Sequence, residues 1–388
     1  MQQIEKHTIK KNVSFCVFLT INLIFSIKYF SRYSDLFLLW TIILSVIQII
    51  IWKKMPIMNL FNKKGYRILD IIVLSLYFIV CIFIFNKVSP ETLNVDRWSV
   101  ITSFWDNYFQ DEYVYAARSH QGNLPGPMPF YFILALPFYL LGELGYFSFL
   151  GVIVFYLTMC FSEIGFKNRA TVLLLILSSS FYIWEIITRS NIFLNSSLIL
   201  FSLVLFFKIK GYDSLKKQLL FGLLFGLLLS TRNVFIVSYI ITFIYLLNKK
   251  IISFNVILRI AVFTLLSFSM TFVPFLYNYI SKFMEINPFI IQSSALIPFG
   301  YSVGIILLSF LIGFLCKKET DVYFYSGIIL FLAIIIHVVH AISIFNVYIA
   351  YIESAADISY FILCVPFFLY YLVSTNDTAV SDMKEYRV

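Results

Sequence analysis

Long runs of apolar residues, separated by short polar clusters, occupy almost the whole chain of 388 residues. An α-helix needs about 20 such residues to cross the hydrocarbon core of a bilayer. A further stretch, 128–142, is shorter and carries Pro129 and Pro137 before it ends at Gly142. The pattern predicts an all-α, polytopic transmembrane bundle of about twelve spans, at residues 12–30, 36–52, 68–86, 145–165, 170–188, 191–207, 218–231, 233–248, 256–277, 297–315, 323–341 and 356–374.

The composition fits a membrane location for the whole chain. Hydrophobic residues make up 61% and charged residues 13%, whereas about 25% of the residues of soluble domains are charged. We therefore expect a single multi-span domain at 1–374, surrounded by the lipid bilayer, and a polar cytoplasmic tail at 375–388. The frequent Ile, Phe, Lys and Asn residues indicate an AT-rich genome and, with it, a bacterial inner membrane.

The positions of the basic residues predict an orientation. The formal net charge is +9, but Lys and Arg occur in short clusters between apolar runs and not in one patch, which argues against nucleic-acid binding. If 128–142 does not cross, 20 of the 29 Lys and Arg, including the clusters within 53–67, 208–217 and 249–250, fall on one side. The positive-inside rule makes that side cytoplasmic. It predicts both termini inside the cell and an interfacial or re-entrant helix at 128–142.

One external segment, 87–127, carries most of the candidate chemistry. It holds five of the twenty acidic residues, two Arg, one of four His and two of five Trp. Any solvated loop needs charges, but this one mixes its acids with Trp and Tyr and leads through a Gly/Pro hinge into the short apolar stretch. Loops held by rigid elements are where active sites tend to lie. We therefore expect an active-site loop on the membrane surface, followed by a juxtamembrane helix at 128–142.

The order of these segments resembles a known family. The span 68–86 is followed by Asp96 in NVDRW and then by PGPMPFYFILALPFYLLGELG. Over roughly residues 68–250 this arrangement resembles the GT-C glycosyltransferases, multi-span enzymes that use polyprenyl-phosphate sugars and include the protein O-mannosyltransferases and the aminoarabinose transferases of lipid A. The chain departs from the pattern in having two spans before the one that leads into the loop, where many members have one. It also has no large soluble domain after the last span, unlike the oligosaccharyltransferases.

The resemblance implies that a sugar is transferred from a polyprenyl-phosphate-linked donor to a lipid or glycan acceptor on the external face of the membrane. Asp96 is then the general base that takes the proton of the acceptor hydroxyl. Its neighbours Arg97 and Trp98 are expected to orient the carboxylate and to offer a stacking face to the sugar. His120 is expected to reach the acceptor or the donor phosphate.

A second acidic pair, Asp111 and Glu112, is expected to assist catalysis at the acceptor site or to hold a divalent cation. Two adjacent carboxylates fall short of the six or more oxygen ligands that a hard cation such as Ca²⁺ takes. The five cysteines are isolated and lack CxxC or His-rich spacing, so neither a zinc site nor a disulfide framework is predicted. No metal ligand is assigned, and no cofactor is certain.

The leaving phosphate needs fixed positive charge, and the planar fork of Arg matches phosphate oxygens. Arg232 and Arg189 fall at external helix ends within apolar sequence, and Arg118 lies just before the Gly/Pro hinge. We expect all three to contact the donor phosphate. The alternative for Arg189 is a pairing with Glu185 one turn earlier. Asp357, at the start of the last apolar run, is expected to help to roof the cavity.

Two other functions fit a polytopic chain of this kind. A polysaccharide polymerase or O-antigen ligase also has about a dozen spans, but its large external loop tends to come late in the chain, whereas here it lies at 87–127. A flippase or transporter of lipid-linked sugars is expected to show paired halves and several charges within its spans. Only Asp70, Glu163, Glu185 and Arg259 come close to that description.

Overall fold

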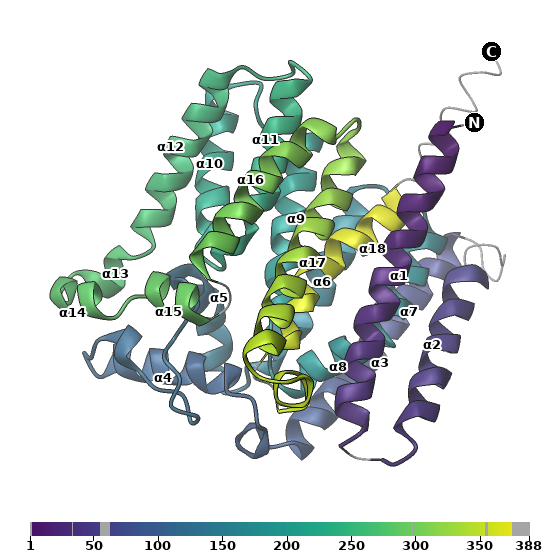
Figure 1. Ribbon diagram of the computed structural model, residues 1–388, viewed down its shortest axis with the longest axis horizontal. Coiled ribbons are helices and arrows are strands. Elements are labelled where there is room, and N and C mark those ends of the chain that lie inside the picture. Colours follow the sequence, from purple (N-terminus) through teal and green to yellow (C-terminus); the bar gives the residue numbers. More distant parts are fainter. Residues whose placement is uncertain (1, 33, 55–62, 296–297, 354–355, 375–388) are drawn as a thin grey trace.

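The computed structural model describes residues 2–32, 34–54, 63–295, 298–353 and 356–374, and all regular elements in these ranges are helical (Figure 1). The predicted tail at 375–388 lies outside the described residues. The α-helices are α1 (Gln2–Phe30), α2 (Phe37–Lys54), α3 (Lys63–Lys87), α4 (Arg97–Phe109), α5 (Pro129–Leu140), α6 (Gly145–Phe161), α7 (Phe166–Leu177), α8 (Ser180–Ile187), α9 (Ile192–Lys208), α10 (Leu215–Leu229), α11 (Ile236–Asn248), α12 (Phe254–Met270), α13 (Val273–Leu276), α14 (Ile280–Glu285), α15 (Pro288–Ala295), α16 (Phe299–Leu315), α17 (Glu319–Ile344) and α18 (Val365–Ser374). Shorter turns of other helix types are η1 (Pro90–Thr92), η2 (Val114–Ala116), η3 (Asn233–Phe235), η4 (Tyr348–Ile352) and η5 (Ile358–Cys364).

The twelve apolar runs all contain helix, because a backbone in lipid has no water to bond and must satisfy its polar groups within the segment. Among the described residues, five segments are long and apolar enough to cross a membrane: α1, α2, α3, α12 with α13, and α17. The count rises to seven if two bent helix pairs each form one span. Helices α9, α11 and α16 are apolar but shorter. The chain is therefore a helical membrane protein, as the sequence predicts.

The predicted span 170–188 is not one straight helix. A break after Leu177 separates α7 from α8, and the two axes differ by 60°. Asn22 of α1, which is 1% exposed, stabilises the break. Its side-chain oxygen accepts a hydrogen bond from the backbone N–H of Ser180 at 3.0 Å, and its carbonyl accepts one from the Ser180 hydroxyl at 2.9 Å. These bonds satisfy groups that the interrupted helix leaves open, so the bend has a structural cause.

The short helix expected at 128–142 is α5. Its 12 residues extend about 18 Å at 1.5 Å per residue, well below the thickness of about 30 Å of the hydrocarbon core. Pro129 occupies the first turn, where its missing N–H costs no bond. Gly142 follows the helix at φ +79°, a conformation that strongly favours glycine. The chain then turns through 118° into α6, so α5 does not continue the axis of α6.

The two ends of the bundle differ in charge. The start of α1, the α11–α12 turn with lysines 249–250 and the α16–α17 turn with lysines 317–318 share one end (Figure 1). We call this the basic end. An ion pair of 2.5 Å between Lys10 and Asp321 fastens α1 to the start of α17 there. Contacts therefore join segments from opposite ends of the sequence at the basic end.

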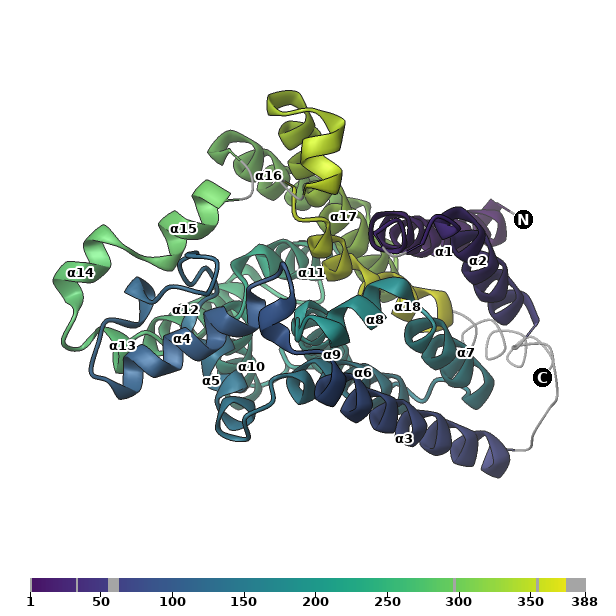
Figure 2. The same cartoon turned by 90° about the horizontal axis from the view of Figure 1, so that it is seen from below.

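The opposite end, which we call the loop end, carries α4, α5 and α13–α15. Figure 2 shows α4 with α13–α15 on one side of this end and α1 with α2 on the other. The Tyr113 hydroxyl donates to the Ile286 carbonyl at 2.6 Å, and the Gln292 amide donates to the Gly126 carbonyl at 2.6 Å. The segment 87–127 is thus packed against α14 and α15, and it contains a helix, α4, with a buried side.

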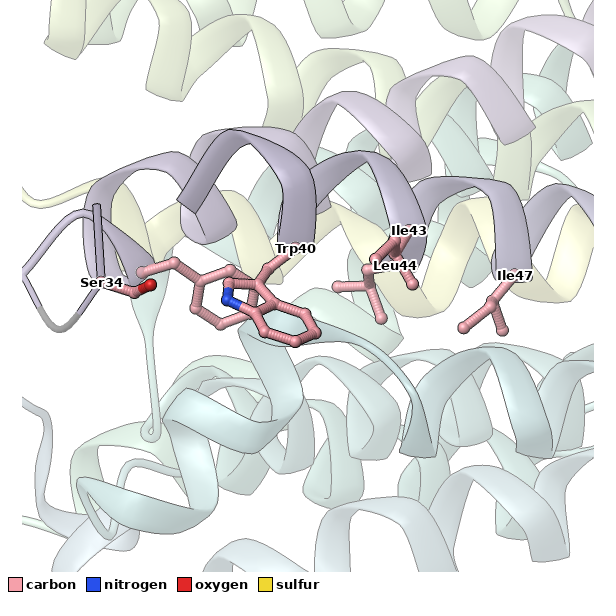
Figure 3. Close-up of a pocket in the computed structure, with 6 residues that line it drawn as sticks. Ser34, Trp40, Ile43, Leu44 and Ile47 are labelled. Carbon is pink, nitrogen blue, oxygen red and sulfur yellow. The ribbon is translucent and has the colours of Figure 1, made fainter. Parts of the chain in front are cut away.

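Apolar side chains cover much of the outer surface of α2, α3 and α12, including Ile42, Ile71 and Leu265, each at least 60% exposed. Apolar side chains on an outer surface are expected where that surface faces lipid. A hollow of about 430 Å³ lies on the α1–α2 face, lined by Phe30, Ser34, Trp40, Ile43, Leu44 and Ile47 (Figure 3). The lining residues are apolar except for Ser34 and the Trp40 indole N–H, and none of them is charged.

Helix α9 lies at the centre of the bundle, in contact with α6, α8, α10, α18 and η5. Gly151 of α6 allows the close approach, since a Cβ atom there would lie 3.0 Å from the backbone nitrogen of Leu194. Although α9 is largely buried, its buried residues include Asn195, Ser196 and Ser197. Three polar residues in succession on a central helix are a feature that a packed apolar core does not require.

Candidate active site

Asp96 precedes α4 at the loop end. It occupies the N-cap position, yet its carboxylate makes no bond to the helix N–H groups. Its Oδ2 atom instead accepts hydrogen bonds from Ser119 Oγ at 2.6 Å and from Asn123 Nδ2 at 2.8 Å. The turn after η2 therefore folds back to hold the carboxylate. The other oxygen, Oδ1, accepts no hydrogen bond from the described residues, which suits a general base.

The same turn brings His120 to Trp98. The two rings stack with centroids 5.4 Å apart and an interplanar angle of 24°. His120 Nδ1 lies 2.7 Å from Ser99 Oγ, and Ser99 Oγ in turn donates to the Asp96 carbonyl at 2.9 Å. The buried Trp98 indole N–H has no hydrogen-bond partner among the described residues. Three of the residues predicted from the sequence, Asp96, Trp98 and His120, thus form one cluster.

Arg97 connects this cluster to the C-terminal part of the chain. Its guanidinium forms an ion pair with Asp357 and donates to Ser359 Oγ at 2.5 Å. Burial of the guanidinium disfavours its charge, but Asp357 outweighs that effect and raises the pKa of Arg97. The pair joins the start of α4 to the start of η5, so the early loop and the last apolar run build one site.

Arg232 and Arg97 both contact the ring of Tyr360. The Arg232 guanidinium carbon is 5.5 Å from the ring centroid of Tyr360 and 5.8 Å from that of Tyr131, while the Arg97 guanidinium is 5.2 Å from the same Tyr360 ring. Arg232 is 7% exposed, and its Nε atom is buried and bonds no acceptor in the part of the chain that the structure describes. Among the described residues, no carboxylate forms an ion pair with it. A buried guanidinium lacking an acceptor is costly unless a ligand supplies one, and phosphate oxygens match its fork.

Arg189 has a different environment. Its guanidinium bonds both oxygens of Glu143, at 3.2 and 3.3 Å, and the carbonyls of Ile187 and Phe85, at 2.8 and 3.2 Å. The side chain is 1% exposed. The predicted alternative partner was Glu185, which bonds elsewhere. These contacts account for Arg189 as a structural residue, and we no longer assign it to the donor phosphate.

The second acidic pair is not part of the cluster. Asp111 and Glu112 follow the C-terminal end of α4, whereas Asp96 precedes its start, and 13 residues of helix separate the two ends by about 20 Å. Both acids are exposed. Arg118 is exposed as well, and it donates to the Gly122 carbonyl at 2.9 Å within its own turn. The distance separates Asp111 and Glu112 from Asp96, so we leave the two acids out of the cluster. Arg118 belongs to the turn that holds Asp96, and its predicted contact with the donor phosphate stays a prediction.

Several residues of the site were not predicted from the sequence. Ser119 and Asn123 hold Asp96, while Tyr131 and Tyr360 flank Arg232. None belongs to a recognisable motif. Asp357, expected only to roof the cavity, forms an ion pair with Arg97.

No group of three or more His, Cys, Asp or Glu side chains that could hold a metal ion occurs in the part of the chain that the structure describes. Comparisons of the chain with models of known protein families, with curated proteins and with solved structures found no match.

Proposed function

We propose that this chain is a membrane glycosyltransferase that transfers a sugar from a polyprenyl-phosphate-linked donor to an acceptor hydroxyl. The observation that carries the proposal is that one end of the bundle holds both a carboxylate with one oxygen free of hydrogen bonds and a buried guanidinium that no acceptor of the described residues bonds. Asp96 provides the first and Arg232 the second. Arg97, adjacent to Asp96 and sharing the Tyr360 ring with Arg232, links the two.

In the proposed reaction the acceptor oxygen attacks the anomeric carbon of the donor sugar. The bond between that carbon and the phosphate oxygen breaks, and polyprenyl phosphate leaves with the electron pair. Asp96 Oδ1 takes the hydroxyl proton, while Ser119 and Asn123 fix the carboxylate through Oδ2. Arg232, assisted by Arg97, stabilises the charge that develops on the leaving phosphate.

The proposal includes twelve crossings, with the basic end in the cytoplasm and the loop end on the external face of a bacterial inner membrane. The positive-inside rule supports this orientation, since the turns at the basic end carry paired lysines. The length of α5 and the 118° turn after it support a juxtamembrane position for that helix. On this topology the site opens toward the lipid headgroups, where a polyprenyl phosphate would present its polar end.

The decisive experiment compares Asp96→Asn with Asp111→Asn in membranes supplied with undecaprenyl-phosphate hexoses and an extract of the envelope glycolipids of the host. Asp96→Asn keeps the shape and both hydrogen-bond partners in reach but removes the base. We expect loss of transfer by about 100-fold or more, the usual contribution of a general base. Asp111→Asn, a matched acid at the far end of α4, should leave transfer unchanged. Undiminished transfer by Asp96→Asn at equal protein level would overturn the assignment.

A further inference from the structure

A group of buried polar side chains without partners lies at the junction of α8 and α9. Glu185, Asn191 and Asn195 are each no more than 1% exposed. The Oε2 atom of Glu185 and both side-chain polar atoms of each asparagine have no hydrogen-bond partner within the described chain, and the Ser190 hydroxyl has none either. Native interiors rarely leave so many polar atoms unsatisfied in one place, so such a group needs an explanation.

The local structure explains how these atoms become available. Asn191 is the N-cap residue of α9, but its side chain does not bond the helix N–H groups. Glu185 does so instead, because its Oε1 atom accepts the backbone N–H of Phe193 at 2.9 Å. Glu185 therefore frees Asn191 from its usual capping role. Asn195 lies one turn further along the same face of α9, bonded through its N–H to the Asn191 carbonyl at 3.2 Å.

These residues adjoin the proposed site. The Asn191 side chain is in a weak contact with the Tyr131 hydroxyl that falls outside ordinary hydrogen-bond geometry, and Tyr131 faces the Arg232 guanidinium. Glu185 interacts electrostatically with Arg97 and with Arg232. The unsatisfied groups therefore lie deeper in the bundle than Arg232, the position assigned to the donor phosphate. They are held on α8 and α9, at the centre of the bundle, and not on a loop.

The set matches the chemistry of a polyhydroxyl ligand. Each asparagine offers two donors and an acceptor with two lone pairs, and the Glu185 Oε2 atom offers further acceptor capacity. A sugar ring presents hydroxyl groups that both donate and accept, and its C–H faces pack on aromatic rings such as that of Tyr131. A bare phosphate or an isoprenoid chain would use none of the carboxylate and amide acceptors.

We propose that Asn191, Asn195 and Glu185 form the subsite that binds the sugar of the donor and selects among sugars. The inference rests on the proposed function, since it takes the donor phosphate to lie at Arg232. The three residues act in specificity and not as the base. The competing explanation is that ordered water fills the same space without any role in binding.

The test measures binding to the full-length protein in nanodiscs. The probes are undecaprenyl phosphate and undecaprenyl phosphate carrying glucose, galactose, mannose or arabinose. We expect the wild type to bind one of the sugar-bearing lipids more tightly than bare undecaprenyl phosphate. Asn195→Leu, close in volume, should reduce that preference by about tenfold, the equivalent of one good hydrogen bond to a buried group, and should leave binding of the bare lipid phosphate unchanged. Asn191→Leu provides a second variant if Asn195→Leu does not fold.

A matched control is Asn22→Leu. Asn22 is equally buried, but it donates to the Phe18 carbonyl at 3.0 Å and accepts from Ser180. We expect Asn22→Leu to lower the thermal midpoint and to leave sugar preference intact. Asn195→Leu should do the reverse, with an unchanged or higher midpoint, because it removes no bond that the protein itself makes.

Three outcomes separate the two levels of the proposal. If Asn195→Leu and Asn191→Leu both keep the sugar preference of the wild type, the unsatisfied polar groups bind only water and the inference is wrong. If no sugar-bearing lipid binds more tightly than the bare phosphate, the inference is also wrong. If even the bare lipid phosphate fails to bind the wild type, the proposed function itself fails.

Discussion

Replacing Arg232 with Gln tests the core of the proposed site, because the structure gives opposite expectations for two buried arginines. The Arg232 side chain has neighbouring Tyr131 and Tyr360 rings but no acceptor within the described residues. Arg189, the matched control, bonds Glu143 and two carbonyls. Both side chains are almost fully buried, at 7% and 1% exposure. Burial alone therefore predicts similar effects, whereas the bonding pattern predicts different ones.

The magnitudes follow from these contacts. Arg232→Gln loses two contacts with aromatic rings, each contributing about 0.5–1 kcal/mol. It also removes a buried charge that forms no ion pair or hydrogen bond with the described residues, which offsets the loss. The free energy of unfolding should change by less than about 1 kcal/mol. Donor binding should weaken by about 1.5–3 kcal/mol, the contribution of a charge-assisted hydrogen bond, or roughly 10- to 150-fold in Kd.

Arg189→Gln should behave in the opposite way. Breaking a buried ion pair costs about 3–5 kcal/mol, and because Glu143 remains 23% exposed we expect about 2–3 kcal/mol of lost stability. Donor affinity of the folded protein should stay within about threefold of the wild type, since Arg189 has no role in the proposed phosphate site.

The assay is thermal unfolding in detergent, with and without undecaprenyl phosphate, on both variants and the wild type. The lipid should stabilise the wild type and Arg189→Gln to a similar extent and should have little effect on Arg232→Gln. The reasoning is refuted if Arg232→Gln unfolds as early as Arg189→Gln yet still gains the full stabilisation from the lipid. That result would make Arg232 a structural residue.

Three further predictions concern the fold. Asp357→Asn removes the carboxylate that pairs with Arg97 and should lower the thermal midpoint at neutral pH, because the buried guanidinium loses its charge partner. Gly226→Ala would place a Cβ atom 2.2 Å from the Thr264 carbonyl oxygen and should lower the free energy of unfolding by about 1–3 kcal/mol. The control Gly304→Ala places its Cβ with no atom within 4 Å and should leave the thermal midpoint unchanged. In a chain without its native cysteines, a single cysteine introduced at Gln121 should react with an impermeant maleimide on intact cells. A single cysteine in the 249–250 turn should react only after the cells are permeabilised. The opposite labelling would show that the proposed topology is inverted.

Much of the architecture follows from local pattern. Apolar runs must become helices in lipid, since the backbone has no other partner for its polar groups, and the predicted runs all contain helix. The short stretch 128–142 was recognisable by Pro129, Pro137 and Gly142, whose effects on helix geometry are local. Asp96 could be selected from the sequence for a similar local reason, since it is an acidic residue close to the end of a span. The bend at Ser180 was not found, because Asn22, which stabilises it, is about 160 residues away in the sequence.

The site needed the tertiary structure because its chemistry depends on which groups remain unsatisfied after folding. The sequences around Arg189 and Arg232 look alike, each a lone arginine in apolar surroundings. Only packing decides that Glu143 engages the first and that two tyrosine rings flank the second. Likewise, the sequence does not distinguish Asp357 from the other nineteen acidic residues, and only the fold places it next to Arg97. Sequence determined the membrane class, the helices and the loop that carries Asp96. The long-range contacts decided which charges are structural and which remain open to a ligand, because hydrogen bonds and ion pairs depend on distance in space.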